Sequence, residues 1–111
     1  MKMKPPAQNR AYIPPHQVLS PRDAEISNMD VQYDGGPSDA DADDYRWTAA
    51  TFNWYGNRVV GMRWNGHAKG MIGNPQSRGN PTWFIVPDEL ADAILREIEK
   101  NSGQWPTREN S

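Results

Sequence analysis

The sequence predicts a small α+β domain in which one C-terminal helix covers a three-stranded antiparallel sheet. Three observations predict this fold. Residues 45–65 hold two runs of aromatic and β-branched side chains around a turn, residues 82–86 form the most hydrophobic run, and an apolar stripe with helical spacing follows residue 88. Ten prolines and a mean hydropathy of −0.90 restrict this core to part of the 111-residue chain.

The first part of the chain, residues 1–44, shows no sustained strand or helix period. Prolines interrupt it repeatedly, and each proline removes a backbone donor and fixes φ. Residues 34–44 hold five carboxylates and no apolar anchor, which is typical of a solvated acidic linker. We therefore expect residues 1–44 to be a largely disordered, acidic, proline-rich arm, with the domain over 45–102. The short apolar patches Tyr12-Ile13 and Gln17-Val18-Leu19 could dock on this domain as an extended arm.

Residues 45–65 are predicted to form a β-hairpin. Gly and Asn near the middle tolerate the positive φ values of a tight turn. Successive side chains of a strand point to opposite faces of the sheet. Met62 and Trp64 should therefore share one face of the second strand, and Arg63 and Asn65 the other.

A long polar loop is predicted over residues 66–81, where glycines and two Asn-Pro steps oppose regular structure. Residues 82–86 should form the third and most buried strand. Pro87 then suits the first turn of a helix, which Gly103 should end. The remaining residues, 103–111, are expected to be a flexible tail.

The residues available for catalysis are few. The chain has no cysteine and two histidines, which leaves little material for a nucleophile, a metal cage or a bound cofactor. His67 has no acidic neighbour in sequence and is interpreted as a solvated loop residue. No apolar run is long enough to cross a membrane. We therefore expect a cytoplasmic protein that is not an enzyme and binds no metal or cofactor.

Charge is segregated along the chain. Residues 1–44 carry four cations and eight acidic residues, residues 45–87 carry five cations and no acidic residue, and residues 88–111 carry three cations and six acidic residues. A formal net charge of −2 therefore hides a basic middle segment between acidic flanks. The basic segment also contains four of the five tryptophans.

If the helix covers one face of the sheet, we expect the other face to be open and to carry Arg63 and Asn65 with Trp47. This pattern suggests a basic, tryptophan-containing sheet face that binds nucleic acid or a nucleoprotein complex. Arginines contact phosphates and base edges, and aromatic rings stack on unpaired bases. The candidate residues are Arg46, Trp47, Arg58, Arg63, Trp64, Asn65, Lys69 and Arg78. An alternative remains open, because tryptophans of small domains commonly form the core and arginine stems commonly cover apolar surface.

Two other functions are compatible with the sequence. The acidic arm, or the loop over 66–81, could bind a protein of a host cell and inhibit it, because a carboxylate-rich segment can occupy a basic groove. The chain could also be a structural or assembly component. The sequence leaves the partner, the choice among DNA, RNA and protein, and the oligomeric state open.

Two resemblances add context. The order strand–strand–strand–helix over 45–100 resembles the plant ethylene-response-type DNA-binding domain and the arm-binding domain of phage integrases, although the long loop departs from both. The runs Gly61-Met-Arg-Trp-Asn-Gly66 and Gly73-Asn-Pro-Gln-Ser-Arg-Gly-Asn-Pro-Thr-Trp-Phe-Ile-Val-Pro87 are similar to small uncharacterised proteins of bacterial phages, prophages and plasmids. This second resemblance implies an accessory protein of a mobile element, but it implies no particular biochemical activity.

Overall fold

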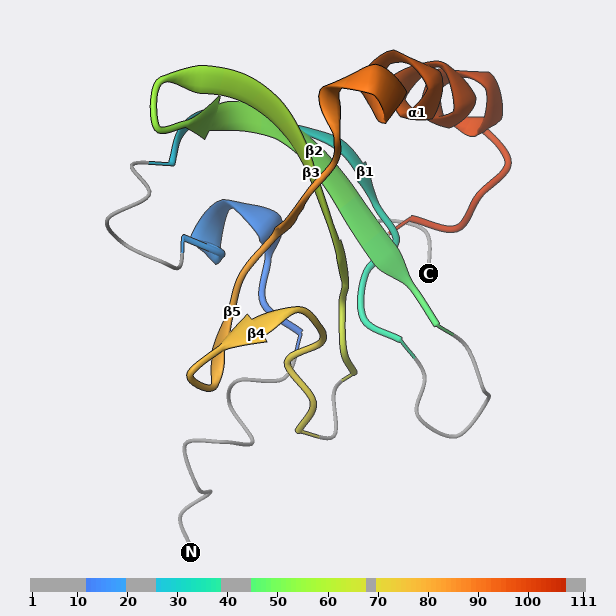
Figure 1. The fold of residues 1–111 in the computed structure, drawn as a ribbon. Coiled ribbons are helices and arrows are strands. Elements are labelled where there is room, and N and C mark those ends of the chain that lie inside the picture. The colour runs from blue at the N-terminus through green and yellow to red at the C-terminus, as the bar shows by residue number, and fades with distance from the viewer. Residues whose placement is uncertain (1–11, 20–25, 39–44, 68–69, 108–111) are drawn as a thin grey trace, which may run out of the picture.

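The computed structural model describes residues 12–19, 26–38, 45–67 and 70–107. Within these residues, a short 3-10 helix, η2, comes first, followed by six strands and one α-helix (Figure 1). The elements are η2 (Pro15–Gln17), β1 (Ser27–Asp34), β2 (Trp47–Trp54), β3 (Asn57–Trp64), β4 (Gln76–Ser77), β5 (Asn80–Pro81), β6 (Phe84–Ile85) and α1 (Asp88–Asn101). The predicted α+β class is confirmed.

The main sheet is antiparallel and has four strands in the order β1-β2-β3-β6. The predicted hairpin is present as β2 and β3, joined by Tyr55 and Gly56 in the positive-φ region. The additional strand, β1, pairs with β2 and comes from the segment assigned to the arm. The boundary at residue 45 is therefore corrected, because β2 finds its second partner on the N-terminal side of that residue.

Two apolar clusters lie on opposite faces of the sheet. On one face, Ile94 and Ile98 of α1 pack with Ala49 and Met62. On the other face, Val18 packs with Ala50, Phe52 and Trp83, all of which are nearly inaccessible to solvent. Figure 1 shows α1 and the blue segment around η2 on different sides of the strands.

The second face was expected to be open, and the structure corrects this expectation. Val18 is fully buried, and its carbonyl accepts a hydrogen bond of 2.8 Å from Trp83 Nε1. Apolar residues in the predicted arm therefore complete the core. A four-stranded sheet with both faces covered buries more apolar surface than a hairpin covered by a single helix.

The loop over 66–81 contains a small hairpin, β4–β5, that the sequence did not predict. Ile72 is buried at 8% exposure and fixes the middle of the loop. The Asn74–Pro75 peptide bond is cis. Helix α1 begins after Pro87, as expected, with Asp88 and Glu89 in its first turn, where the helix dipole favours negative charge.

The tail after α1 folds back on the domain. The Trp105 ring makes edge contacts with Tyr33 and Trp47, with ring centroids 5.4 and 5.5 Å apart respectively. Tyr33 also donates a 2.5 Å hydrogen bond from its hydroxyl to the Pro106 carbonyl. Among the described residues, no helix combines the length and the hydrophobicity that crossing a membrane requires.

Candidate binding surface

Arg63 is a structural residue inside the domain. It is 5% exposed, and its guanidinium donates hydrogen bonds to the carbonyls of Ile72, Thr82 and Pro75, the last at 3.3 Å. Desolvation by burial lowers the pKa of Arg63 to about 10, so the side chain stays charged at neutral pH. The expectation that Arg63 lies on an open face is corrected, because the loop over 66–81 closes over it.

Asn65 is buried in the same way, at 3% exposure. Its Nδ2 donates to the Gly36 carbonyl at 2.7 Å, and Thr48 Oγ1 donates to its Oδ1 at 2.6 Å. Asp34 joins this network, because its Oδ1 accepts a 2.8 Å hydrogen bond from the Gly36 amide. Asp34 and Gly36 are therefore ordered partners of the sheet, and the part of the predicted acidic linker that the structure describes is not a solvated chain.

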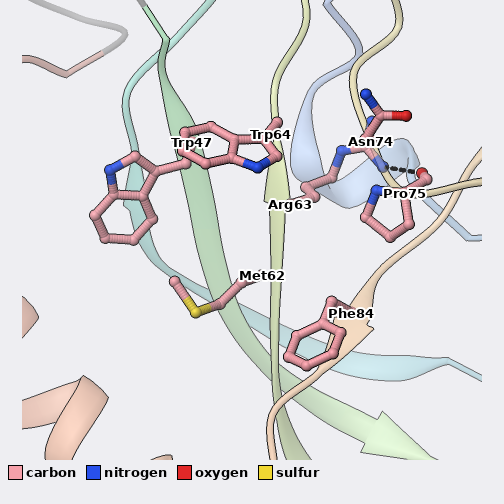
Figure 2. A pocket seen from close by; sticks show the side chains of 7 residues that line it. All are labelled: Trp47, Met62, Arg63, Trp64, Asn74, Pro75 and Phe84. Carbon is pink, nitrogen blue, oxygen red and sulfur yellow. Dashed lines mark hydrogen bonds between the residues drawn. The ribbon is translucent and has the colours of Figure 1, made fainter.

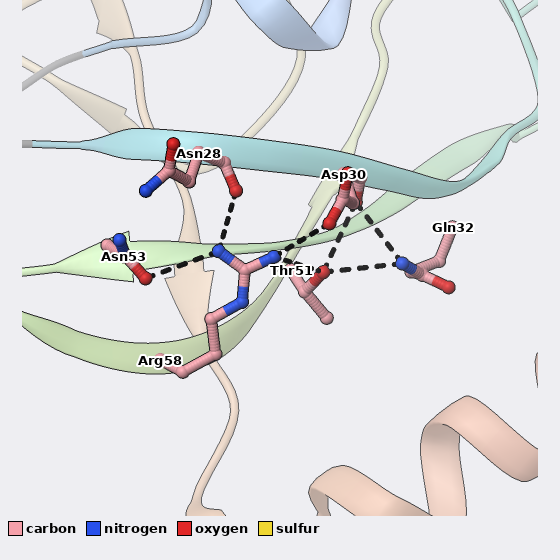
Figure 3. Close-up of polar contacts among 6 residues, drawn as sticks. All are labelled: Asn28, Asp30, Gln32, Thr51, Asn53 and Arg58. Carbon is pink, nitrogen blue, oxygen red and sulfur yellow. Dashed lines mark hydrogen bonds and ion pairs between the residues drawn. The ribbon is translucent and has the colours of Figure 1, made fainter.

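Arg58 contacts the neighbouring strands (Figure 3). Its Nη2 lies 2.8 Å from Asp30 Oδ2, and its Nη1 donates to the Asn28 carbonyl at 2.6 Å. These contacts join β3 to β1 across β2. Because both side chains of the ion pair are largely exposed, it adds little to stability.

Arg46 and Trp47 are also engaged within the protein. Arg46 Nη1 donates to the Gly35 carbonyl at 2.9 Å. Trp47 packs against Tyr33, with ring centroids 4.6 Å apart. The sheet register places Trp47 opposite Trp64 and Thr48 opposite Arg63, so Trp47 and Arg63 lie on opposite faces.

An open groove lies on the helix-covered side of the sheet, beside these contacts (Figure 2). We call it the aromatic groove, and its volume is about 490 Å3. In Figure 2, Met62 lies between Trp47 and Phe84. The lining residues are Trp47, Met62, Arg63, Trp64, Asn74, Pro75 and Phe84.

Two aromatic side chains of the groove are unusually accessible. Trp64 is 53% exposed and Phe84 is 57% exposed. The backbone holds Trp64 in place through reciprocal hydrogen bonds with Asn74, at 2.7 and 3.1 Å. Phe84 pairs with Met62 across β3 and β6. Large apolar side chains that stay exposed next to a concave surface are typical of interaction sites.

The predicted site residues therefore separate into groups. Trp47 and Trp64 line the aromatic groove, and Arg63 contributes to its wall while its guanidinium bonds loop carbonyls. Arg78 is exposed at the tip of the β4–β5 hairpin. Arg46, Arg58 and Asn65 are held by the contacts described above, and Lys69 lies outside the described residues.

The sequence did not indicate Phe84, Met62, Asn74 or Pro75 as groove residues. Phe84 stands in the most hydrophobic run, which was expected to form the most buried strand. Strand alternation offers a signal, since Trp83 is 4% exposed whereas its neighbour Phe84 faces solvent. Asn74 and Pro75 carry no comparable local signal, because their position depends on how the loop folds over Arg63.

In the part of the chain that the structure describes, no three His, Asp or Glu side chains are close enough together to hold an ion. Comparisons with protein-family models, curated proteins and solved structures found no match. The geometry of the aromatic groove is therefore the basis for a functional conclusion.

Proposed function

We propose that the protein is a non-enzymatic binding module that takes up an apolar segment of a partner protein in the aromatic groove. The exposure of Trp64 and Phe84 at the edge of the groove is the observation that carries this proposal. Grooves lined by aromatic side chains commonly receive extended peptide segments, and tryptophan is enriched among residues that dominate binding energy. A volume of about 490 Å3 suits a few side chains.

The charges near the groove favour a protein partner over nucleic acid. Nucleic-acid affinity depends on several cations that contact phosphates and release counterions. Here the Arg63 guanidinium bonds loop carbonyls, and Arg58 forms an ion pair with Asp30. The described sheet thus offers few of the cations that a phosphate backbone would contact.

Single-stranded nucleic acid remains the second candidate. Arg78 is exposed and belongs to a hairpin that starts next to the groove residue Pro75. A base stacked on Trp64 with a phosphate at Arg78 would combine the aromatic and cationic contacts typical of such sites. Binding of a labelled (dT)20 oligonucleotide that weakens steeply with salt and requires Trp64 would support this candidate.

The proposal can be tested by selecting ligands from a random 12-residue peptide display library on the full chain. Trp64→Ala and Phe84→Ala variants serve for counter-selection, and Tyr55→Ala is the matched control, because Tyr55 is 54% exposed at the far end of the β2–β3 hairpin. We expect enriched peptides with apolar residues that bind the wild type and Tyr55→Ala alike. Loss of Trp64 or Phe84 should weaken binding at least tenfold.

Peptides that bind all four proteins equally, or the absence of any enriched peptide, would overturn the proposal. The resemblance to accessory proteins of mobile elements supports a protein of a bacterial host as the natural partner. In that setting, occupation of the groove by a host segment would block the other interactions of that segment. Inhibition of a host complex, including a defence complex, is the resulting biological role that we propose.

A further inference from the structure

The tip of the β4–β5 hairpin carries an unusual residue. Gln76 pairs with Pro81 and Ser77 pairs with Asn80, so Arg78 and Gly79 form a two-residue connection. Arg78 has φ 55° and Gly79 has φ 80°. Two-residue hairpin turns with both central residues at positive φ strongly prefer Asn, Asp or Gly at the first position. The turn geometry therefore does not favour an arginine at position 78.

Arg78 also has no internal partner among the residues that the structure describes. It is exposed, and no described side chain or carbonyl pairs with its guanidinium. Arg46, Arg58 and Arg63 differ in this respect, because each donates to protein acceptors. Strained backbone positions concentrate at functional sites, and an exposed, unpaired cation at such a position points to a binding role.

The hairpin connects this cation to the aromatic groove. Asn74 and Pro75 line the groove and directly precede β4. Pro75 and Arg78 are three residues apart in an extended strand and turn, so their Cα atoms are at most about 10 Å apart at roughly 3.3 Å per residue. An extended peptide covers the same distance in about three residues.

We propose that Arg78 contacts the segment bound in the aromatic groove from outside the groove and pairs with a carboxylate of that segment. The partner segment then has an apolar residue for the groove and an Asp or Glu about three positions away. This inference rests on the function proposed above and specifies the chemistry of the partner. Planar bidentate pairing makes arginine suited to carboxylates.

The test uses labelled peptides from the display selection, each in two forms, with its acidic residue or with the matching amide. Their affinity for wild type, Arg78→Asn and Arg78→Lys is measured by fluorescence anisotropy. Asn suits the turn, so Arg78→Asn keeps the hairpin. Arg96→Gln is the control, because Arg96 is an exposed cation on α1.

We expect Arg78→Asn to weaken binding of the acidic peptides about twofold to fivefold, the order of magnitude of an exposed ion pair. The same variant should leave the amide forms unchanged, and Arg96→Gln should leave both unchanged. Peptides that require Trp64 and Phe84 but ignore Arg78 would overturn this inference and leave the proposed function intact. Dependence of (dT)20 binding on Arg78, without any such effect on the peptides, would assign the cation to nucleic acid and also overturn it.

Discussion

Trp47 lies directly opposite Trp64 across the β2–β3 ladder, one register position from the Thr48–Arg63 pair. This relationship separates the two kinds of residue that the sequence had grouped together. The tryptophans line an open groove on the helix side, whereas the guanidinium of Arg63, which also contributes to the groove wall, is held by loop carbonyls. Function and stability should therefore respond to different substitutions.

Replacement of Trp64 by Ala should remove binding with little loss of stability. The side chain is half exposed, and the hydrogen bonds to Asn74 use the backbone alone. We expect the free energy of unfolding to change by less than about 1 kcal/mol, because exposed positions contribute little. Urea unfolding measures this change, and peptide anisotropy measures binding. A larger loss of stability would show that Trp64 is a core residue.

Replacement of Arg63 should have the opposite effect. Arg63→Met leaves the carbonyls of Ile72 and Thr82 without their donor, and unsatisfied polar groups cost about 1–3 kcal/mol each. We expect a loss of about 2–4 kcal/mol in urea unfolding, with faster amide exchange over residues 70–82. Arg96→Gln is the control, and an unchanged unfolding midpoint for Arg63→Met would contradict the prediction.

The pKa of Arg63 also predicts how its contribution varies with pH. Because burial lowers its pKa to about 10 in the folded protein, below the ordinary value of an exposed arginine, the unfolded chain binds more protons above about pH 10. This residue therefore makes stability rise with pH only above about pH 10. The difference in unfolding free energy between wild type and Arg63→Met should be constant from about pH 6 to pH 9, since both states are then charged.

Substitution at the hairpin tips should stabilise the protein. Tyr55 has φ 51° and Arg78 has φ 55°, and both precede a glycine in a two-residue turn. Asn is favoured at such positions, so Tyr55→Asn and Arg78→Asn should each add about 0.5–1 kcal/mol. Asn28 already has φ 51°, and Asn28→Ala should destabilise. The thermal unfolding temperature should rise for Tyr55→Asn and Arg78→Asn and fall for Asn28→Ala.

A methyl group at Gly61 should disturb the core. A Cβ there would lie 2.6 Å from Phe52 Cε2, and Phe52 is fully buried. We expect Gly61→Ala to cost about 1–3 kcal/mol, as overpacking does. Gly103→Ala is the matched control, because nothing lies within 4 Å of a Cβ at Gly103. Equal stability of the two variants would show that the core accommodates the methyl group.

The N-terminal segment should be required for folding. Residues 45–111 alone lack β1 and the Val18 contact with Trp83, so Phe52 and Ala50 lose their cover. We expect this fragment to show no cooperative unfolding transition by circular dichroism. A chain that lacks only residues 1–11 should unfold like the full chain, because Tyr12 and all described contacts are retained. Cooperative unfolding of 45–111 would restore the domain boundary at residue 45.

Local sequence patterns were sufficient to predict the α+β fold class and several of the strands and the helix. The alternation that placed Arg63 and Trp64 on opposite faces is present in β3, and α1 begins after Pro87 and ends near Gly103. These features follow from strand and helix periods and from turn and capping preferences, each of which acts within a few residues.

By itself, the sequence determined which residues share a face of an element; only the tertiary structure decided what covers that face. Val18 and Trp83 are 65 residues apart, and their hydrogen bond closes a face that local patterns left open. Folding of the loop over 66–81 likewise encloses Arg63 and brings Pro75 to the aromatic groove. Burial depends on contacts between distant segments, so a basic residue on a strand is assigned to surface or core only when those segments are in place.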